Sequence, residues 1–349
     1  MSYNTETFKN FLTKAGISYS ENVSLKTKTW IKRGGVAKLW IEPLSANDLE
    51  RVCTYLYESD IFFEIIGHTS NMYFLNTYNP EIVISTKKLV HYDILENEII
   101  CECGVSISKL SAELVKQGIK GFEGFISLPG TVGGAAVNNS GCYGSILSSV
   151  ILRADILLSS GEVKNCRKEE LGYTHRSSFL KTKQLKGTLI RLYFKKEYGD
   201  KEILIDKADK NRKARKENQE APDGNLGSVF ANMALKKDFI FFILRIIRNI
   251  LKPFVKREKR RKISNILLFK LKHKEMLLPY VSPKNYNCYL WRDEKADDYF
   301  FEYLKFIKDI SVNATVEIEI RTDGMKINNN STYENTLGLG GTETLLLDV

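Results

Sequence analysis

The chain has 349 residues, of which 43% are hydrophobic and 27% are charged, so it can bury a substantial core and is expected to form two or three domains. No uncharged apolar run reaches the length of a membrane span and the polar start does not resemble a signal peptide, so we expect a cytoplasmic protein. The formal net charge is +10, but residues 236–274 hold 14 Lys or Arg against two acids, a local charge of +12. The basicity therefore belongs to one segment.

The first elements lead to a loop of small and polar residues. An amphipathic helix with Phe8, Phe11 and Leu12 and then a loop are expected before residue 24, followed by a strand at 39–43 and a helix at 45–59 that Ser45 caps. A strand at 62–66 runs into the loop 67–72. A strand that ends in such a turn offers backbone N–H groups to a phosphate. Alternation predicts further strands at 81–85 and 99–105, and 108–117 reads as a helix that ends at Gly118.

A glycine-rich run follows at residues 128–144, with five glycines and many other small side chains. Such a backbone can approach a ligand closely and suits a pyrophosphate. On composition alone, a surface turn is as good an interpretation as a phosphate-binding loop. The apolar residues Phe122, Phe125 and Ile126 directly before the run favour a packed site.

The second half of the chain carries three further segments of interest. Strands are expected at 150–158 and 189–194, with a hairpin turn at 159–162, and Arg176 between them is by pattern alone a solvated surface charge. Ser228 lies beside a glycine in a loop. Residues 316–320 alternate as a half-exposed strand with Glu317, Glu319 and Arg321 on its polar face, after a helix at 298–309. Residues 325–349 receive no assignment.

The six cysteines are scattered, and only Cys101 and Cys103 are close together. Their spacing is poor for a disulfide and lacks the pairing of a zinc site. In an alternating segment both sulfurs point to one face of a strand. We interpret the cysteines as core thiols and expect no metal site.

The run from Leu128 to Gly144 resembles the signature of the UDP-N-acetylenolpyruvoylglucosamine reductase family, flavoproteins of peptidoglycan precursor synthesis. The resemblance implies an α+β fold, with a two-lobed FAD-binding domain of the vanillyl-alcohol-oxidase/PCMH type and a C-terminal substrate domain. The lobes are expected at 1–86 and 87–197, and the substrate-side domain at 198–313 with a basic amphipathic insertion at about 236–274. Residues 314–349 would hold a catalytic glutamate strand and the tail.

The resemblance also implies FAD as the cofactor, with NADPH as the electron donor. In the loop 67–72, Thr69 replaces the second glycine of the family pattern, and His68 falls at a variable position, which favours FAD without a covalent bond. The residues expected to bind the cofactor are Gly67, His68, Thr69, Ser70, Asn71, Met72, Pro129, Gly130, Thr131, Gly133, Gly134, Ala135, Asn139 and Gly141.

Three residues match the catalytic positions of the family. Arg176 would hold the substrate carboxylate, Ser228 would donate a proton, and Glu319 would assist protonation. His175 stands where the family has tyrosine, and Met233 replaces a proline. The residues expected to bind the substrate, a nucleotide sugar, are Arg176, Tyr143, Asn232 and Asn287.

The resemblance therefore implies an FAD-dependent, NADPH-using reductase of an enolpyruvyl nucleotide sugar, in cell-wall or surface-polysaccharide precursor synthesis. It is weakest after Asn232, where recognition of the UDP-sugar is in question. Two alternatives stay open. One is a divergent flavin oxidoreductase acting on a different sugar nucleotide at the membrane surface. The other is a non-catalytic flavin-binding or membrane-docked interaction protein.

Residues 239–253 are expected to form an amphipathic helix, with Arg245, Arg248 and Lys252 on one stripe, before a basic run at 256–262. Three interpretations remain open for this segment: a helix packed in the substrate domain or at a homo-oligomer interface, peripheral membrane contact through 239–262, and nucleic-acid binding. Nucleic acid is the least favoured because no recognised motif accompanies the charge.

Overall fold

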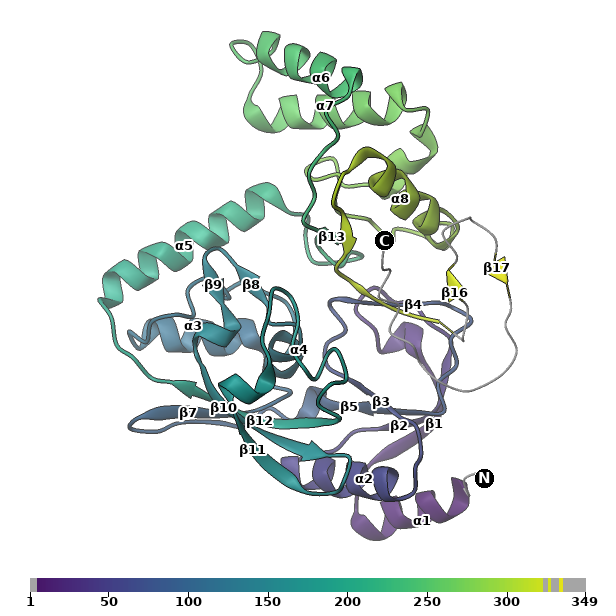
Figure 1. The fold of residues 1–349 in the computed structure, drawn as a ribbon, viewed down its shortest axis with the longest axis vertical. Coiled ribbons are helices and arrows are strands. Elements are labelled where there is room, and N and C mark those ends of the chain that lie inside the picture. The colour runs from purple at the N-terminus through teal and green to yellow at the C-terminus, as the bar shows by residue number, and fades with distance from the viewer. Residues whose placement is uncertain (1–4, 323–325, 328–332, 335–349) are drawn as a thin grey trace. The chain divides into compact units, whose positions relative to one another are not determined.

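The computed structural model describes residues 5–322, 326–327 and 333–334 and divides into two compact units. Unit 1 comprises Met1–Thr27, Val36–Thr69 and Asn79–Ala214, and unit 2 comprises Lys28–Gly35, Ser70–Tyr78 and Arg215–Val349. Two short segments from the first eighty residues thus belong to unit 2. Figure 1 shows the elements of both units.

Unit 1 contains a four-stranded mixed sheet in the order β1-β2-β5-β3. β1 and β2 are antiparallel, whereas β5 runs parallel to both β2 and β3. The helix α2 follows the sheet strand β2 and packs on α1 through the rings of Phe8 and Tyr55, whose centroids lie 5.1 Å apart. The bounds are α1 Thr5–Ala15, β1 Tyr19–Ser24, β2 Val36–Ile41, α2 Ala46–Glu58, β3 Glu64–Ile66 and β5 Ile82–Ser85.

A second, antiparallel sheet of unit 1 has the strand order β11-β10-β12-β7-β6. The helices α3 and α4 and the small hairpin β8-β9 lie between its strands in sequence. The bounds are β6 Tyr92–Ile94, β7 Glu98–Glu102, α3 Ile107–Lys116, α4 Val132–Val137, β8 Gly141–Cys142, β9 Ser145–Ile146, β10 Ile151–Leu158, β11 Val163–Arg167 and β12 Gly187–Lys195.

The core of unit 1 confirms several local predictions. Ser45 caps α2 by accepting a hydrogen bond from the N–H of Asp48 at 3.1 Å, which satisfies one of the free amides of the first turn. Phe122 and Phe125 are fully buried, so the glycine-rich run follows a packed segment. Cys101 and Cys103 are buried free thiols, as predicted.

The long helix α5 (Lys201–Asn218) was not predicted, because it is strongly charged and has little apolar periodicity. It buries only Leu204 and Ala208. Polar contacts add to this packing: Nδ2 of Asn211 donates to the carbonyl oxygen of Glu123 at 3.1 Å. Tertiary contacts therefore hold a helix whose own pattern is weak.

The described residues of unit 2 combine short strand pairs with the helices α6, α7 and α8. β4 pairs with β15 in parallel, whereas β13 with β14 and β16 with β17 are antiparallel. The bounds are β4 Met72–Phe74, β13 Phe230–Ala231, α6 Phe239–Ile250, α7 Arg257–Leu271, α8 Ala296–Ile310, β14 Thr315–Val316, β15 Glu319–Arg321, β16 Lys326–Ile327 and β17 Tyr333–Glu334. The pairing of β4 with β15 explains why residues 70–78 belong to this unit.

Aromatic side chains dominate the core of unit 2. Tyr289 and Tyr303 are fully buried, with ring centroids 4.9 Å apart. The ring of Tyr289 also meets those of Trp291 and Phe300, at 5.0 and 5.1 Å. The hydroxyls of the two tyrosines donate to the carbonyl oxygens of Ala296 and Tyr286, so that the polar ends of both side chains are satisfied.

Three secondary-structure predictions are corrected. Residues 19–24 form the strand β1, not a loop, because they pair with β2. The strand β5 does not alternate: all four of its residues are buried, since it lies between two parallel neighbours. The strand predicted at 316–320 is interrupted, so that Val316 pairs with β13 and Glu319 with β4, although Ile318 and Ile320 are both buried as expected.

Among the described residues, none of the helices combines the length and the apolar character that a membrane crossing needs.

Candidate active site

Gly67, at the end of β3, brings the first predicted cofactor loop against the second. A Cβ atom at this position would lie 2.5 Å from Oγ1 of Thr131, so the close approach requires glycine. Thr131 is the N-cap of α4, and its Oγ1 accepts a hydrogen bond from the N–H of Gly134 at 3.1 Å. The two small-residue loops therefore meet within unit 1.

Thr69 has a left-handed backbone conformation, with φ of 56°, and is only 4% exposed. A β-branched residue rarely adopts this conformation, whereas glycine adopts it without steric cost. Thr69 is the residue that replaces the second glycine of the family pattern. The loop thus has a glycine-type backbone even though the residue is threonine.

His68 is partly buried, and burial lowers the pKa of its imidazole below the usual value. The positive charges of Lys87 and Lys109 lower this pKa further, which favours the neutral ring. The same two charges create a positive potential at the loop. This potential suits the pyrophosphate of FAD, and by this observation the loop fits that cofactor.

The amides at the start of α4 already have acceptors within the protein. The N–H groups of Val132 and Gly133 donate to the carbonyl oxygens of Val105 and Cys103, both at 2.8 Å. A Cβ atom at Gly133 would lie 2.8 Å from both the Cβ and the carbonyl oxygen of Cys103. Part of the glycine content therefore serves close backbone packing beside β7, and these two amides are not directed at a pyrophosphate in this conformation.

The Asn139 side chain joins the end of α4 to the turn that carries Arg176. Nδ2 of Asn139 donates to the carbonyl oxygen of Thr174 at 2.7 Å, and its Oδ1 accepts from the N–H of Ser148 at 3.1 Å. A second link is the hydroxyl of Ser178, which donates to the carbonyl oxygen of Val137 at 2.7 Å. The turn is therefore fastened to the glycine-rich run.

Arg176 itself lies in a tight turn between Thr174 and Ser177, whose backbones exchange hydrogen bonds at 3.1 and 3.4 Å. Its φ is 57°, a left-handed value that is uncommon for a residue other than glycine. Nζ of Lys181 donates to the carbonyl oxygen of Arg176 at 3.0 Å. The backbone of the arginine is thus held firmly.

Tyr143 occupies the two-residue turn of the hairpin β8-β9. Its φ is 48° and that of Gly144 is 82°, the pattern of a type I′ turn. The hairpin also contacts the segment before the glycine-rich run, since Oγ of Ser145 accepts from the N–H of Gly124 at 3.1 Å. Tyr143 therefore lies in the same unit as Arg176.

In unit 2, Asn71 binds the strand that carries Glu319. The carbonyl oxygen of Asn71 accepts from the N–H of Glu319 at 2.8 Å, and its Nδ2 donates to the carbonyl oxygen of Glu317 at 3.2 Å. The next residue, Met72, is the β4 partner of Glu319 in the parallel pair. Two residues of the first loop are thus in direct contact with a predicted catalytic strand.

The carboxylate of Glu319 forms an ion pair with Arg321, in which Nη2 donates to Oε2 at 3.0 Å. Both side chains are largely buried, with 16% and 12% of their surface exposed. The sequence pattern had placed Arg321 on the same strand face as Glu319 but had suggested no role for it. Its contact adds Arg321 to the site, because it orients the carboxylate.

Ser228 precedes a short strand that Asn287 holds in place. Oδ1 of Asn287 accepts from the N–H of Phe230 at 2.8 Å, and its Nδ2 donates to the carbonyl oxygen of Phe230 at 2.7 Å. The carbonyl oxygen of Val229 accepts from the N–H of Glu317 at 2.8 Å, which links this segment to the glutamate strand. Asn287 thus positions the serine segment.

The predicted site residues divide between the two units. Ser228, Glu319, Asn232, Asn287, Ser70, Asn71 and Met72 lie in unit 2, and the others, including Arg176 and Tyr143, lie in unit 1. Asn232 has a φ of 53° and follows β13. Within unit 2, backbone pairing brings Asn71, the Ser228 segment and the Glu319 strand together.

The family model for an FAD binding domain matches residues 37–167, which include both small-residue loops. The chain therefore has an FAD-binding domain, and its α+β fold agrees with the prediction.

Curated relatives extend the match beyond this domain. The chain is 33% identical to UDP-N-acetylenolpyruvoylglucosamine reductase of Carboxydothermus hydrogenoformans over 213 residues, which cover 61% of this chain and 70% of that protein. It is 30% identical to the protein of the same name from Bacillus pumilus over 229 residues, or 65% and 75% of the two chains.

A solved structure shares the fold. The crystal structure of UDP-N-acetylenolpyruvylglucosamine reductase from Thermus caldophilus matches with a TM-score of 0.62 and 20% identity, covering 87% of this chain and 98% of that one.

Proposed function

This chain belongs to the UDP-N-acetylenolpyruvoylglucosamine reductase family, and we propose that it is an FAD-dependent reductase that uses NADPH to reduce the enolpyruvyl group of a nucleotide sugar. The reaction would serve cell-wall or surface-polysaccharide precursor synthesis in the cytoplasm. One observation carries the proposal: Asn71, in the first cofactor loop, binds the strand of Glu319 at both Glu317 and Glu319. This contact supports a site in which hydrogen bonds hold Asn71 of the cofactor loop beside the catalytic acid Glu319.

The chemistry that FAD supplies when bound is hydride transfer to C3 of the enolpyruvyl group. Negative charge then develops on the substrate toward its carboxylate. In the proposal, the guanidinium of Arg176 binds that carboxylate and stabilises the charge. The hydroxyl of Ser228 donates a proton to C2, and Glu319 assists this protonation.

The side-chain contacts support these roles. A serine hydroxyl is a weak acid, so the position of Ser228 relative to C2 must be well defined. Asn287 restrains the segment through two hydrogen bonds to Phe230. Arg321 orients the Glu319 carboxylate, and Asn139 fastens the turn of Arg176.

Anaerobic mixing tests the function in two separate steps. Addition of NADPH should bleach the flavin absorbance, and UDP-N-acetylglucosamine enolpyruvate should then restore it. Bleaching without restoration would reject this substrate and favour the alternative, a flavin oxidoreductase acting on a different sugar nucleotide. Purified protein that is colourless and does not take up added FAD would refute the whole proposal.

A matched pair of variants isolates the proton donor. Ser228→Ala should bleach with NADPH at the rate of the unaltered protein but restore its absorbance at least about a hundredfold more slowly, as expected for loss of a general acid. Ser282→Ala is the control, since Ser282 is a buried serine of the same unit whose hydroxyl donates to Glu220. Equal restoration rates in both variants would remove Ser228 from the mechanism.

A second candidate property, peripheral contact with an anionic membrane, is favoured by the exposed face of α6. Four apolar residues follow one stripe of this helix with large exposed fractions: Phe239 at 73%, Phe242 at 58%, Ile246 at 42% and Ile250 at 63%. Phe254, just beyond the helix, is 83% exposed. The basic residues that begin α7 would complement anionic headgroups beside this stripe.

Cosedimentation with vesicles tests the membrane contact. The double variant Phe242→Ser/Ile250→Ser should lose most of the binding to vesicles that contain phosphatidylglycerol. The control Phe62→Ser/Val90→Ser removes two exposed apolar side chains from unit 1 and should bind as the unaltered protein does. Binding that persists in the first variant would rule out the stripe as the contact surface.

A further inference from the structure

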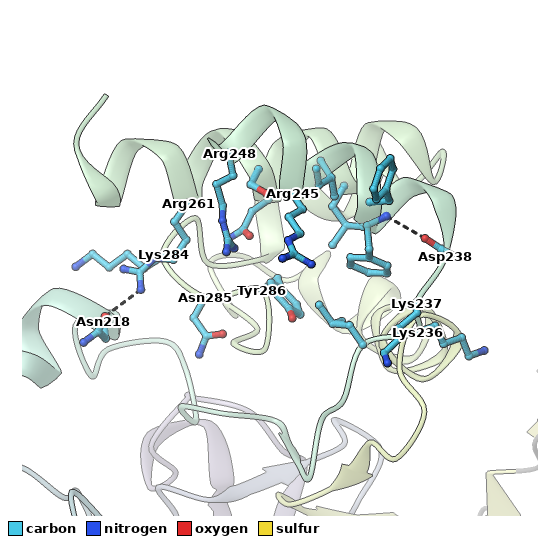
Figure 2. Close-up of a pocket in the computed structure, with 17 residues that line it drawn as sticks. Asn218, Lys236, Lys237, Asp238, Arg245, Arg248, Arg261, Lys284, Asn285 and Tyr286 are labelled. Atoms are coloured by element: carbon cyan, nitrogen blue, oxygen red, sulfur yellow. Dashed lines mark hydrogen bonds between the residues drawn. The ribbon is translucent and has the colours of Figure 1, made fainter. Parts of the chain in front are cut away.

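A cavity of about 760 Å³ lies in unit 2, between α6, α7 and the loop that contains Asn285 and Tyr286. Figure 2 shows the side chains of Arg245 and Arg248 extending from α6 into this space, above the loop. The volume is that of a typical small-molecule site. The sequence suggested membrane or nucleic-acid contact for this segment, but not a small-molecule ligand.

The lining is strongly basic. One acid, Asp238, lines the cavity, and its carboxylate already forms an ion pair with Nζ of Lys272 at 2.6 Å. Six cationic side chains line the cavity: Lys236, Lys237, Arg245, Arg248, Arg261 and Lys284. Within the described part of the chain, none of the six forms an ion pair with a carboxylate.

Two of these cations are held in place by neutral acceptors. Nη1 of Arg261 donates to Oδ1 of Asn218 at 2.9 Å, and Nζ of Lys284 donates to the carbonyl oxygens of Lys216 and Gln219, both at 3.3 Å. Such contacts fix the side chains without neutralising their charge. The positive potential of the cavity is therefore retained, and an anion that enters meets groups already in position.

The remainder of the lining is largely apolar and aromatic. Leu235, Leu244 and Leu268 contribute aliphatic surface, and Phe241 contributes a ring. Tyr286 is mostly buried, which raises the pKa of its phenol, while the charge of Arg248 acts in the opposite direction. The hydroxyl therefore stays protonated and can donate a hydrogen bond. A ligand that matches this lining combines negative charge with an apolar or ring-shaped portion.

We propose that this cavity is a binding site for a phosphorylated ligand of about nucleotide size, bound mainly by Arg245 and Arg248. Arginine suits this role because its planar guanidinium forms paired hydrogen bonds with phosphate oxygens. A nucleoside diphosphate and the headgroup of a phosphorylated lipid share this chemistry. None of the residues proposed to bind the flavin or the nucleotide-sugar substrate lines this cavity, so variants of Arg245 and Arg248 test it separately from the proposed function.

Calorimetric titration of the full chain with inorganic pyrophosphate and with uridine diphosphate tests whether the ligand is a soluble phosphate compound. Cosedimentation with phosphatidylcholine vesicles that contain phosphatidic acid, compared with phosphatidylcholine alone, tests the lipid source. The variant Arg245→Gln/Arg248→Gln should weaken binding of the successful probe at least tenfold. The control Lys295→Gln/Lys305→Gln removes the same charge from exposed positions of unit 2 that neither line the cavity nor belong to α6 or α7, and should retain binding.

The outcomes separate clearly. Binding of either soluble probe with selective loss in the arginine variant supports the site and identifies a nucleotide-type ligand. Selective loss of phosphatidic acid binding alone supports the site with a lipid headgroup. Absence of binding to every probe, unchanged binding in the arginine variant, or an equal loss in both double variants would overturn the proposal. Circular dichroism and thermal melting of each variant check that the fold is unchanged.

Discussion

Nδ2 of Asn139 donates a hydrogen bond to the carbonyl oxygen of Thr174 at 2.7 Å, across 35 residues of sequence. Asn139 lies two residues beyond the end of α4, and Thr174 begins the turn of Arg176. The family pattern had suggested that this asparagine contacts the cofactor. In the structure, both polar atoms of its side chain bind the protein, so it positions the turn that carries the predicted carboxylate ligand.

Asn139→Ala should lower the free energy of unfolding by about 1–3 kcal/mol, because the N–H of Ser148 loses its acceptor and the carbonyl oxygen of Thr174 loses one of its two donors. Urea denaturation followed by circular dichroism measures the change. Asn97→Ala, at an exposed position between β6 and β7, is the control and should change the stability less. Equal effects would mean that the link to Thr174 contributes little.

Thr69→Gly should cost less stability than the same change at a buried threonine with an ordinary φ, since relief of the left-handed strain offsets part of the loss of side-chain contacts and of the entropy that glycine adds to the unfolded chain. Thr86→Gly is a matched control, because Thr86 is also 4% exposed but has an ordinary φ. That control should be clearly destabilising in thermal unfolding. A loss at Thr69 as large as the loss at Thr86 would contradict the strain argument.

The ion pair between Glu319 and Arg321 should show energetic coupling of about 1–3 kcal/mol in a double-mutant cycle with Glu319→Gln and Arg321→Gln. Each single variant removes one charge of the pair and leaves the opposite charge largely buried, whereas the double variant removes both charges. Chemical denaturation of the four proteins yields the coupling. Additive losses would show that the two side chains do not act as a pair.

His68 should make stability depend on pH in a defined direction. Because burial lowers the pKa of His68 in the folded state, the unfolded chain binds more protons at this residue as the pH falls. Its stabilising contribution is therefore present above the unfolded pKa of about 6.5 and decreases as the pH falls below it. The measurement compares the unfolding free energy of the unaltered protein with that of His68→Gln from pH 8 to about pH 5. The advantage of the unaltered protein should shrink or reverse as the pH falls. A constant difference would contradict the lowered pKa.

Asn287→Ala should reduce catalytic efficiency more than it reduces stability, if Asn287 holds the segment of Ser228 through Phe230. We expect a loss of at least about tenfold in kcat/KM from misplacement of the proton donor. Steady-state kinetics and urea denaturation of the same protein provide both values. A purely thermodynamic loss with unchanged kinetics would assign Asn287 a structural role alone.

Local signals were sufficient for much of the fold. The cap at Ser45, the apolar spacing of α2 and the stripe of α6 are set by residues within one or two helical turns, and the structure has each element where it was predicted. The glycine-rich run and its neighbours also identified the family without any long-range information. The helix α5 was missed because its charged sequence carries no comparable pattern.

The sequence by itself thus determined the family, its FAD-binding domain and most helices, because these depend on short-range spacing and residue type. Only the tertiary structure decided that Asn71 binds the Glu319 strand, 248 residues away, and that the predicted strand at 316–320 divides between two partners. It also decided that cations from α6, α7 and the loop at 284 surround one cavity. The residue pattern of one segment does not specify which distant segment its backbone will pair with, so these hydrogen bonds can be identified only in the folded structure.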